Sequence, residues 1–127
     1  MAFYALIAIG VGAALGAWLR WAFGLWLNSI WPELPVGTLS ANLIGGFLVG
    51  LSVAFFMQHP NLPPEWRLFI ITGFLGGLTT FSTFSIETVT LLMRGQYVWA
   101  LAIITLHLGG CLLMTFIGLQ AYKWFHQ

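Results

Sequence analysis

The stretch GGLTTFSTFS, residues 76–85, places hydroxyl side chains and two phenylalanines inside an otherwise apolar segment. Phe81 and Phe84 are three residues apart, so they share one face of a helix. A phenyl ring is electropositive at its edge, and two edges can contact a small anion without trapping it. Ser82, Thr83 and Ser85 add hydroxyl donors along the same helix. These residue types favour an anion pathway, whereas ordinary packing of two phenylalanines leaves the hydroxyl groups unexplained.

The residues before the phenylalanines predict a break in that helix. Gly76 and Gly77 lose more backbone entropy in a helix than other residues do, and Thr79 and Thr80 are β-branched. Non-helical backbone at membrane depth is stable only where it is buried in protein or lines a cavity. Carbonyl groups released near 76–79 carry partial negative charge and suit a monovalent cation.

A second group of polar residues lies in an earlier apolar segment. Thr38, Asn42, Gly46 and Gly50 recur at four-residue spacing and share one helix face. Asn42 presents two neutral N–H donors, which either form an interhelical hydrogen bond or face an anion pathway. Taken alone, Asn42 favours the interhelical hydrogen bond, but its occurrence together with the predicted break favours the pathway.

The last apolar segment carries a third polar face, formed by His107, Cys111 and Thr115. No second histidine or glutamate stands at ligand spacing, which argues against zinc and leaves His107 as a packing residue or a pathway residue. Glu87 lies inside the third apolar segment, where an ionisable residue is a functional candidate. A protonated and paired carboxyl is the alternative for Glu87.

The composition defines the environment in which these groups must act. Of 127 residues, 60% are hydrophobic and 6% are charged, and the mean hydropathy is +0.94. Soluble domains carry roughly 25% charged residues, so this chain cannot build a solvated surface and must lie in a lipid bilayer. It has no basic or acidic run, which excludes an electrostatic surface for nucleic acid. Its single cysteine excludes an internal disulfide.

The predicted fold is an all-α membrane protein with four transmembrane helices and the third helix broken near Gly76–Thr79. Each apolar segment is long enough to cross a hydrocarbon core, which needs about 20 residues. Prolines in the connections at 28–37 and 58–65 prevent the helices from continuing. The short connections predict one domain over residues 1–127. The four segments span residues 3–27, 38–57, 66–93 and 98–122.

The basic residues give no preferred orientation in the membrane. Arg67 and Lys123 fall on one side of the four predicted spans, and Arg20 and Arg94 fall on the other. One explanation is that the first helix alone sets the orientation. The other is dual topology, in which the chain inserts both ways and forms an antiparallel homodimer with inverted symmetry. Because four helices are too few to enclose a solvated path, we favour the dimer.

Close packing between helices is predicted by three G-x-x-x-G pairs. Small residues at this spacing let two backbones approach each other in lipid. The pairs are Gly12 with Gly16, Gly46 with Gly50, and Gly73 with Gly77.

Two stretches together carry a family resemblance. GTLSANLIGG at 37–46, followed by GFLGGLTTFSTFS at 73–85, resembles the Fluc/CrcB family of fluoride ion channels, and the likeness extends over nearly the whole chain. The resemblance implies a multi-pass protein of the bacterial inner membrane that passively exports fluoride from the cytoplasm. It also implies an antiparallel homodimer with two pores and a central structural sodium ion. Backbone carbonyls matching Gly76 and Thr79 from both copies would hold that ion.

The resemblance also implies which residues line the pore. Phe81, Phe84 and Asn42 match the principal pore residues of the family. We expect Arg20 near an aqueous mouth, and Cys111 departs from the family by replacing an expected serine. The remaining matches are secondary polar positions, namely Thr38, Ser82, Thr83, Ser85, Glu87, His107 and Thr115.

Alternative functions fit the residues less well. No nucleophile–base pair, metal cluster or phosphate-binding loop is present in the sequence, so we do not expect an enzyme. A small multidrug-resistance-type transporter needs a carboxylate in the middle of the first span, which has none. An assembly subunit accounts for the G-x-x-x-G pairs but not for the polar break.

Overall fold

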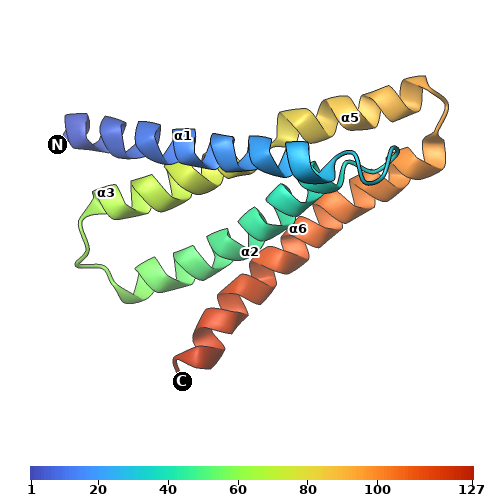
Figure 1. The fold of residues 1–127 in the computed structure, drawn as a ribbon. Coiled ribbons are helices and arrows are strands. Elements are labelled where there is room, and N and C mark those ends of the chain that lie inside the picture. The colour runs from blue at the N-terminus through green and yellow to red at the C-terminus, as the bar shows by residue number, and fades with distance from the viewer.

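The computed structural model describes all 127 residues and is entirely helical (Figure 1). Three apolar segments form the continuous helices α1 (Ala2–Leu27), α2 (Val36–Gln58) and α6 (Tyr97–Phe125). The third segment is divided into α3 (Pro64–Arg67), the π-helix η1 (Leu68–Leu75), α4 (Gly76–Leu78) and α5 (Phe81–Met93). By length and hydropathy the chain has four candidate membrane spans, which confirms the predicted number.

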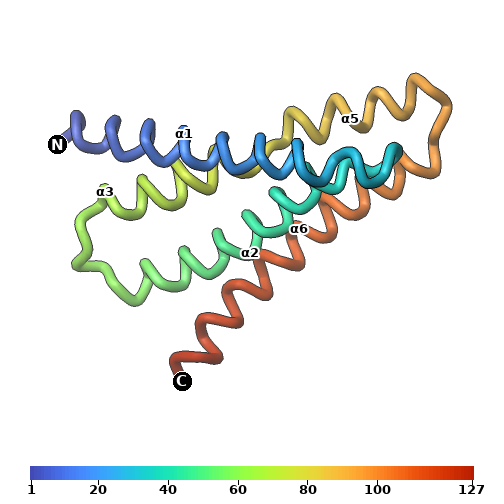
Figure 2. Tube along the Cα trace, viewed as in Figure 1, coloured from blue at the N-terminus to red at the C-terminus, as the bar shows by residue number.

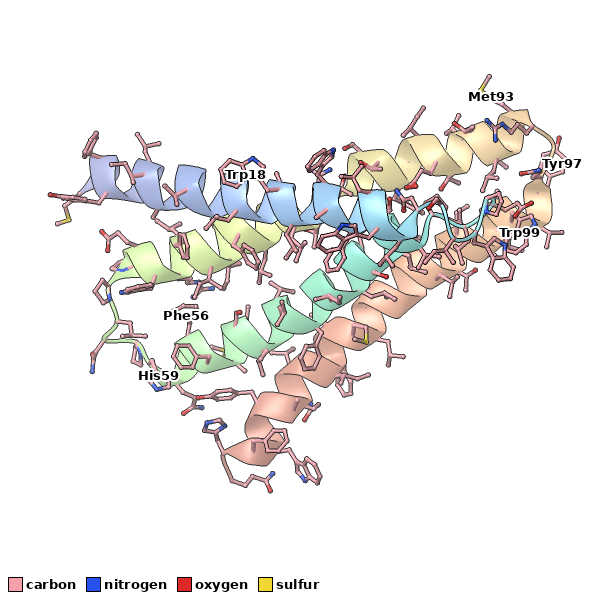
Figure 3. All side chains as sticks on the ribbon, in the orientation of Figure 1. Trp18, Phe56, His59, Met93, Tyr97 and Trp99 are labelled. Atoms are coloured by element: carbon pink, nitrogen blue, oxygen red, sulfur yellow. The ribbon has the colours of Figure 1, made fainter.

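The helices form two packed pairs. α1 lies against η1 and α4, and α2 lies along α6 (Figures 1 and 2). The N-terminus, the α2–α3 connection and the C-terminus lie at one end of the bundle, as four spans require. Figure 3 places Phe56 and His59 near that end, and Tyr97 and Trp99 at the opposite end, beside the α5–α6 connection. α5 leaves the first pair at the break and packs on α6 instead.

The G-x-x-x-G pairs make the close helix contacts that the sequence predicts. A Cβ atom on Gly73 would lie 3.1 Å from the Cα atom of Gly12, so α1 and η1 touch backbone to backbone. Gly46 faces α6, where an added Cβ would lie 3.1 Å from the carbonyl oxygen of Cys111. Backbones approach this closely only where at least one of them has glycine at the contact.

The start of α2 is held by a side chain from the preceding connection. Asn28 Oδ1 accepts hydrogen bonds from the backbone N–H groups of Gly37 at 2.8 Å and Thr38 at 3.1 Å. These amides have no partner inside the helix, and Pro35 at the N-cap offers no side-chain acceptor. Asn28 therefore fixes the first turn of α2 and, with it, the helix face that carries Asn42.

The predicted break in the third helix is present, and the structure places it at Thr79 and Thr80. Both residues have extended backbone, with φ and ψ of −87° and 151° at Thr79 and −149° and 118° at Thr80. Gly76 and Gly77 stay helical, although their backbone entropy was one reason to expect the break. β-Branched residues adopt extended backbone readily, whereas Gly77 is required by the close approach of α1, since a Cβ there would meet the carbonyl of Ala13.

Candidate ion pathway at the helix break

The break is held open by the side chain of Asn42. Its Nδ2 atom donates to the carbonyl oxygen of Thr80 at 3.0 Å, and its Oδ1 atom accepts from the Thr80 N–H at 2.7 Å. The amide thus satisfies both backbone groups of one extended residue, as a neighbouring strand would. The interhelical hydrogen bond, one of the two alternatives for Asn42, is present, and a role of Asn42 in an anion pathway stays a prediction.

The backbone carbonyls released at the break include those of Gly76 and Thr79. In a continuous helix the N–H groups of Thr80 and Thr83 would donate to the carbonyls of Gly76 and Thr79. Here the Thr80 N–H donates to Asn42, and the Thr83 N–H donates to Thr80 Oγ1 at 3.1 Å, capping α5. Gly76 and Thr79 are the residues matched to the sodium site by resemblance. Their oxygens lack the donor of the next turn and carry only partial negative charge, which is the kind of group that coordinates sodium at half-helix ends.

Arg20 contacts a third carbonyl at the break. Its Nε atom donates to the carbonyl oxygen of Gly77 at 3.0 Å, which replaces the helical partner that the break removes. The guanidinium charge lies at the C-terminal end of a half-helix, where the backbone dipole favours a cation. Arg20 therefore belongs to the break itself, and its predicted place near an aqueous mouth stays a prediction.

The two phenylalanines lie in contact, edge to face. Their ring centroids are 5.4 Å apart and the ring planes meet at 69°. Phe84 is 6% exposed and also contacts the ring of His107, with centroids 4.6 Å apart, whereas Phe81 is 71% exposed. The one-face spacing predicted from the sequence is confirmed, and one ring of the pair lies on the outside of the protomer.

A groove of about 420 Å³ lies between α2, the break and α6. It brings together four of the predicted pore residues and both residues of the predicted sodium site. Most of its remaining lining is apolar or glycine, so the polar groups are few. The predicted residues that line it are Asn42, Gly76, Thr79, Phe81, Phe84 and His107.

Other predicted pore residues lie outside this groove. Thr38 Oγ1 donates to Glu87 Oε2 at 3.1 Å, and Glu87 lines a separate cavity of about 200 Å³ together with Glu33 and Arg94. The Thr115 hydroxyl donates to the carbonyl of Cys111 in its own helix, at 2.9 Å. On α5, Ser82 and Ser85 are exposed and Thr83 is half-buried.

Thr80 is the residue of the site that sequence reasoning missed. Its hydroxyl caps α5, accepts from Thr83 N–H and donates to Thr83 Oγ1 at 3.0 Å, while its backbone pairs with Asn42. The available signal was a threonine directly before a helix start, which is a favoured N-cap residue. From the sequence, Thr80 is predicted only to weaken the helix as a β-branched residue.

The sequence is similar to those of known proteins over nearly its whole length. Residues 7–119 match the family described as CrcB-like protein, Camphor Resistance (CrcB). The chain is 63% identical over 127 residues to the fluoride-specific ion channel FluC of Nitrosospira multiformis. The alignment covers all of this chain and 99% of that protein. It is 61% identical over 117 residues to the protein of the same name from Cupriavidus metallidurans, covering 92% and 93% of the two chains. For the one from Nitrosomonas europaea the identity is 55% over 120 residues, or 94% of each chain.

Proposed function

Because the chain belongs to the CrcB-like family, we propose that it is a fluoride-specific ion channel through which fluoride leaves the cytoplasm passively. The resemblance seen in the sequence is confirmed by the family match and by the relatives. The chain is a multi-pass protein of the bacterial inner membrane, and membership of a channel family means that it is not an enzyme.

The observation that carries this proposal is the groove at the break. Fluoride is small and strongly hydrated, so a selective path must replace its water with several modest contacts. The groove offers the edge-to-face pair of Phe81 and Phe84 next to the ring of His107, with few other polar groups. A ring edge attracts an anion weakly, which permits both binding and exit.

We propose that a second copy of the chain closes the groove into an ion pathway. Phe81 is 71% exposed on the single protomer, and a pore residue must be enclosed to exclude lipid. The balanced basic residues favour two copies in opposite orientations, which gives one pathway along each. The carbonyls of Gly76 and Thr79 from both copies would hold a central sodium ion, which supplies positive charge between the two pathways.

The direct test of the function is fluoride efflux from liposomes that contain the purified protein. We expect fluoride to leave at a rate that rises with protein content, while chloride-loaded liposomes of the same batch retain their anion. Efflux equal to that of protein-free liposomes would show that the chain is not a fluoride channel.

The proposed dual topology predicts two orientations in one membrane. A protease-cleavable tag after Gln127 should be cut on only a fraction of molecules when protease is added to one side, and on all of them after the vesicles are opened. The physical reason is the balance of basic residues in the sequence, with Arg67 and Lys123 after or between spans on one side and Arg20 and Arg94 assigned to the other. Complete cleavage, or complete protection, in closed vesicles would eliminate the antiparallel dimer.

Arg20 should control the rate of transport through its charge. We expect Arg20→Gln to slow initial fluoride efflux while fluoride remains preferred over chloride. An electrostatic effect of this kind is screened by salt, so the difference from wild type should shrink as ionic strength rises. Arg94→Gln is the matched control, because Arg94 is exposed and lies at the end of α5, away from the break. An unchanged rate for Arg20→Gln would refute a role of this charge in attracting anions.

A further inference from the structure

The orientation of the Asn42 amide is fixed by the backbone of Thr80. An N–H group can only donate and a carbonyl can only accept, so Oδ1 must face the Thr80 N–H and Nδ2 must face the Thr80 oxygen. The reverse orientation would place two donors together at 2.7 Å and two acceptors together at 3.0 Å. One Nδ2 hydrogen is thus used by Thr80.

The second Nδ2 hydrogen determines the tautomer of His107. Asn42 Nδ2 lies 3.0 Å from His107 Nδ1 in a buried contact. Because the amide nitrogen is a donor only, His107 Nδ1 must be the acceptor and cannot carry a proton. The imidazole is therefore neutral and carries its proton on Nε2.

The Nε2–H group is the remaining hydrogen-bond donor of the His107 ring. His107 is 4% exposed and lines the groove, with its ring against Phe84. No protein atom accepts a hydrogen bond from Nε2, yet this atom is not sealed in the interior. Glu87 Oε1 is the one fully buried side-chain polar atom that lacks a partner. Nε2 therefore keeps some accessible surface, and because His107 lines the groove we infer that this neutral donor faces it.

We propose that His107 Nε2–H is the hydrogen-bond donor that contacts the anion in the groove, and that Asn42 is a positioning residue that sets this donor. The inference rests on the proposed fluoride function and deepens it. Both N–H groups of Asn42 are already bonded, so Asn42 has no donor left for the anion. The order of contacts runs from the Thr80 backbone through Asn42 to His107, and from His107 to the anion.

The other two histidines provide an internal comparison. His59 Nδ1 lies 2.8 Å from the carbonyl oxygen of Phe55, and His126 Nδ1 lies 3.0 Å from that of Tyr122. A carbonyl only accepts, so both of these imidazoles carry a proton on Nδ1. Figure 3 shows His59 beyond the end of α2, far along the helix from the break. The chain thus contains one Nε2–H imidazole and two Nδ1–H imidazoles when all three are neutral.

Nitrogen NMR on protein with ¹⁵N-labelled histidine measures the tautomer of each imidazole directly. At alkaline pH, where exposed histidines are neutral, long-range ¹H–¹⁵N spectra should show one Nε2–H tautomer, and His107 should be its source. His59→Gln and His126→Gln assign the other two signals. Sodium fluoride should shift the His107 Nε2 resonance, whereas sodium chloride at equal concentration should not. An Nδ1–H tautomer at His107, or no fluoride-dependent shift, overturns the inference.

The tautomer measured by NMR and the fluoride efflux measured in liposomes test different claims. If efflux from liposomes is normal but His107 has the wrong tautomer, this inference fails and the proposed function stands. If no efflux occurs, the proposed function fails whatever the tautomer is. Asn42→Asp tests the positioning role, because a carboxylate can only accept and should draw the His107 proton to Nδ1. Retention of the Nε2–H tautomer in a folded Asn42→Asp protein would refute that role.

Two variants of His107 separate its two nitrogens. In His107→Asn the side-chain oxygen can still accept from Asn42 near the position of Nδ1, but no donor reaches the position of Nε2. His107→Gln places an amide N–H near Nε2. Loss of a hydrogen bond to a charged group costs about tenfold or more, so efflux should fall by that factor in His107→Asn and be partly kept in His107→Gln. Wild-type efflux from an assembled His107→Asn dimer, or equal losses in both variants, would count against the donor role.

Discussion

Replacing Phe81 by isoleucine should abolish most fluoride efflux from a protein that still assembles as the wild type does. Isoleucine preserves an apolar side chain of similar bulk but has no electropositive ring edge. If Phe81 only packs, the swap should act on stability alone, because volume-conserving apolar substitutions usually cost under about 1.5 kcal/mol. The measurement is initial fluoride efflux, with dimer content checked on the same sample by size-exclusion chromatography.

The structure supplies a matched control for this substitution. Phe69 stands edge to face with Trp66, with centroids 6.4 Å apart, much as Phe81 stands with Phe84 at 5.4 Å. Phe69→Ile breaks a comparable aromatic pair outside the groove and should leave transport nearly intact. Phe84→Ile should lose transport like Phe81→Ile, and it should also be less stable, because Phe84 packs with Leu91 and Ile103 in the core. Wild-type efflux from an assembled Phe81→Ile dimer would mean that this ring only packs.

Much of the fold could be predicted because the bilayer restricts the possibilities. A chain of 60% hydrophobic residues must form helices or a closed barrel in lipid, and prolines mark where the helices stop. The ends of the four spans accordingly agree with the structure to within a few residues. The position of the break was less accessible, since it depends on tertiary contacts of α4. Gly77 remains helical where it touches Ala13, and the backbone becomes extended only at Thr79.

In the candidate site too, features set by neighbouring residues could be predicted, whereas contacts between distant residues could not. The F-x-x-F spacing is local, and it correctly predicted that Phe81 and Phe84 lie on one face, where the structure shows their rings in contact. The partner of Asn42 is a backbone group 38 residues away, and the partner of Arg20 is one 57 residues away. Spacing within one segment carries no information about such contacts. For this reason the sequence could name Asn42 as a polar residue at membrane depth but could not tell which group it binds.

Adjacent glycines at the break should respond in opposite ways to alanine. In the helical segment before the break, an added Cβ on Gly77 would collide with the carbonyl of Ala13 and lie 3.1 Å from its Cα atom. The same atom on Gly76 would meet only the carbonyl of Ile71, at 3.7 Å, which is ordinary contact. Overpacking typically costs about 1–3 kcal/mol, and here both sides of the contact are backbone, so no side chain can rotate away.

Gly77→Ala should therefore lower the thermal midpoint of unfolding. It should also slow efflux, because pushing α1 away from α4 separates Arg20 from the Gly77 carbonyl. Gly76→Ala should unfold at or above the wild-type midpoint, since alanine favours a helix over glycine by up to about 1 kcal/mol. Tryptophan fluorescence during heating of the detergent-solubilised protein measures both variants. Equal destabilisation by the two substitutions would mean that close approach of α1 is not what requires glycine at Gly77. A stabilising effect of both would mean that the two glycines serve only to weaken the helix before the break, as their composition first indicated.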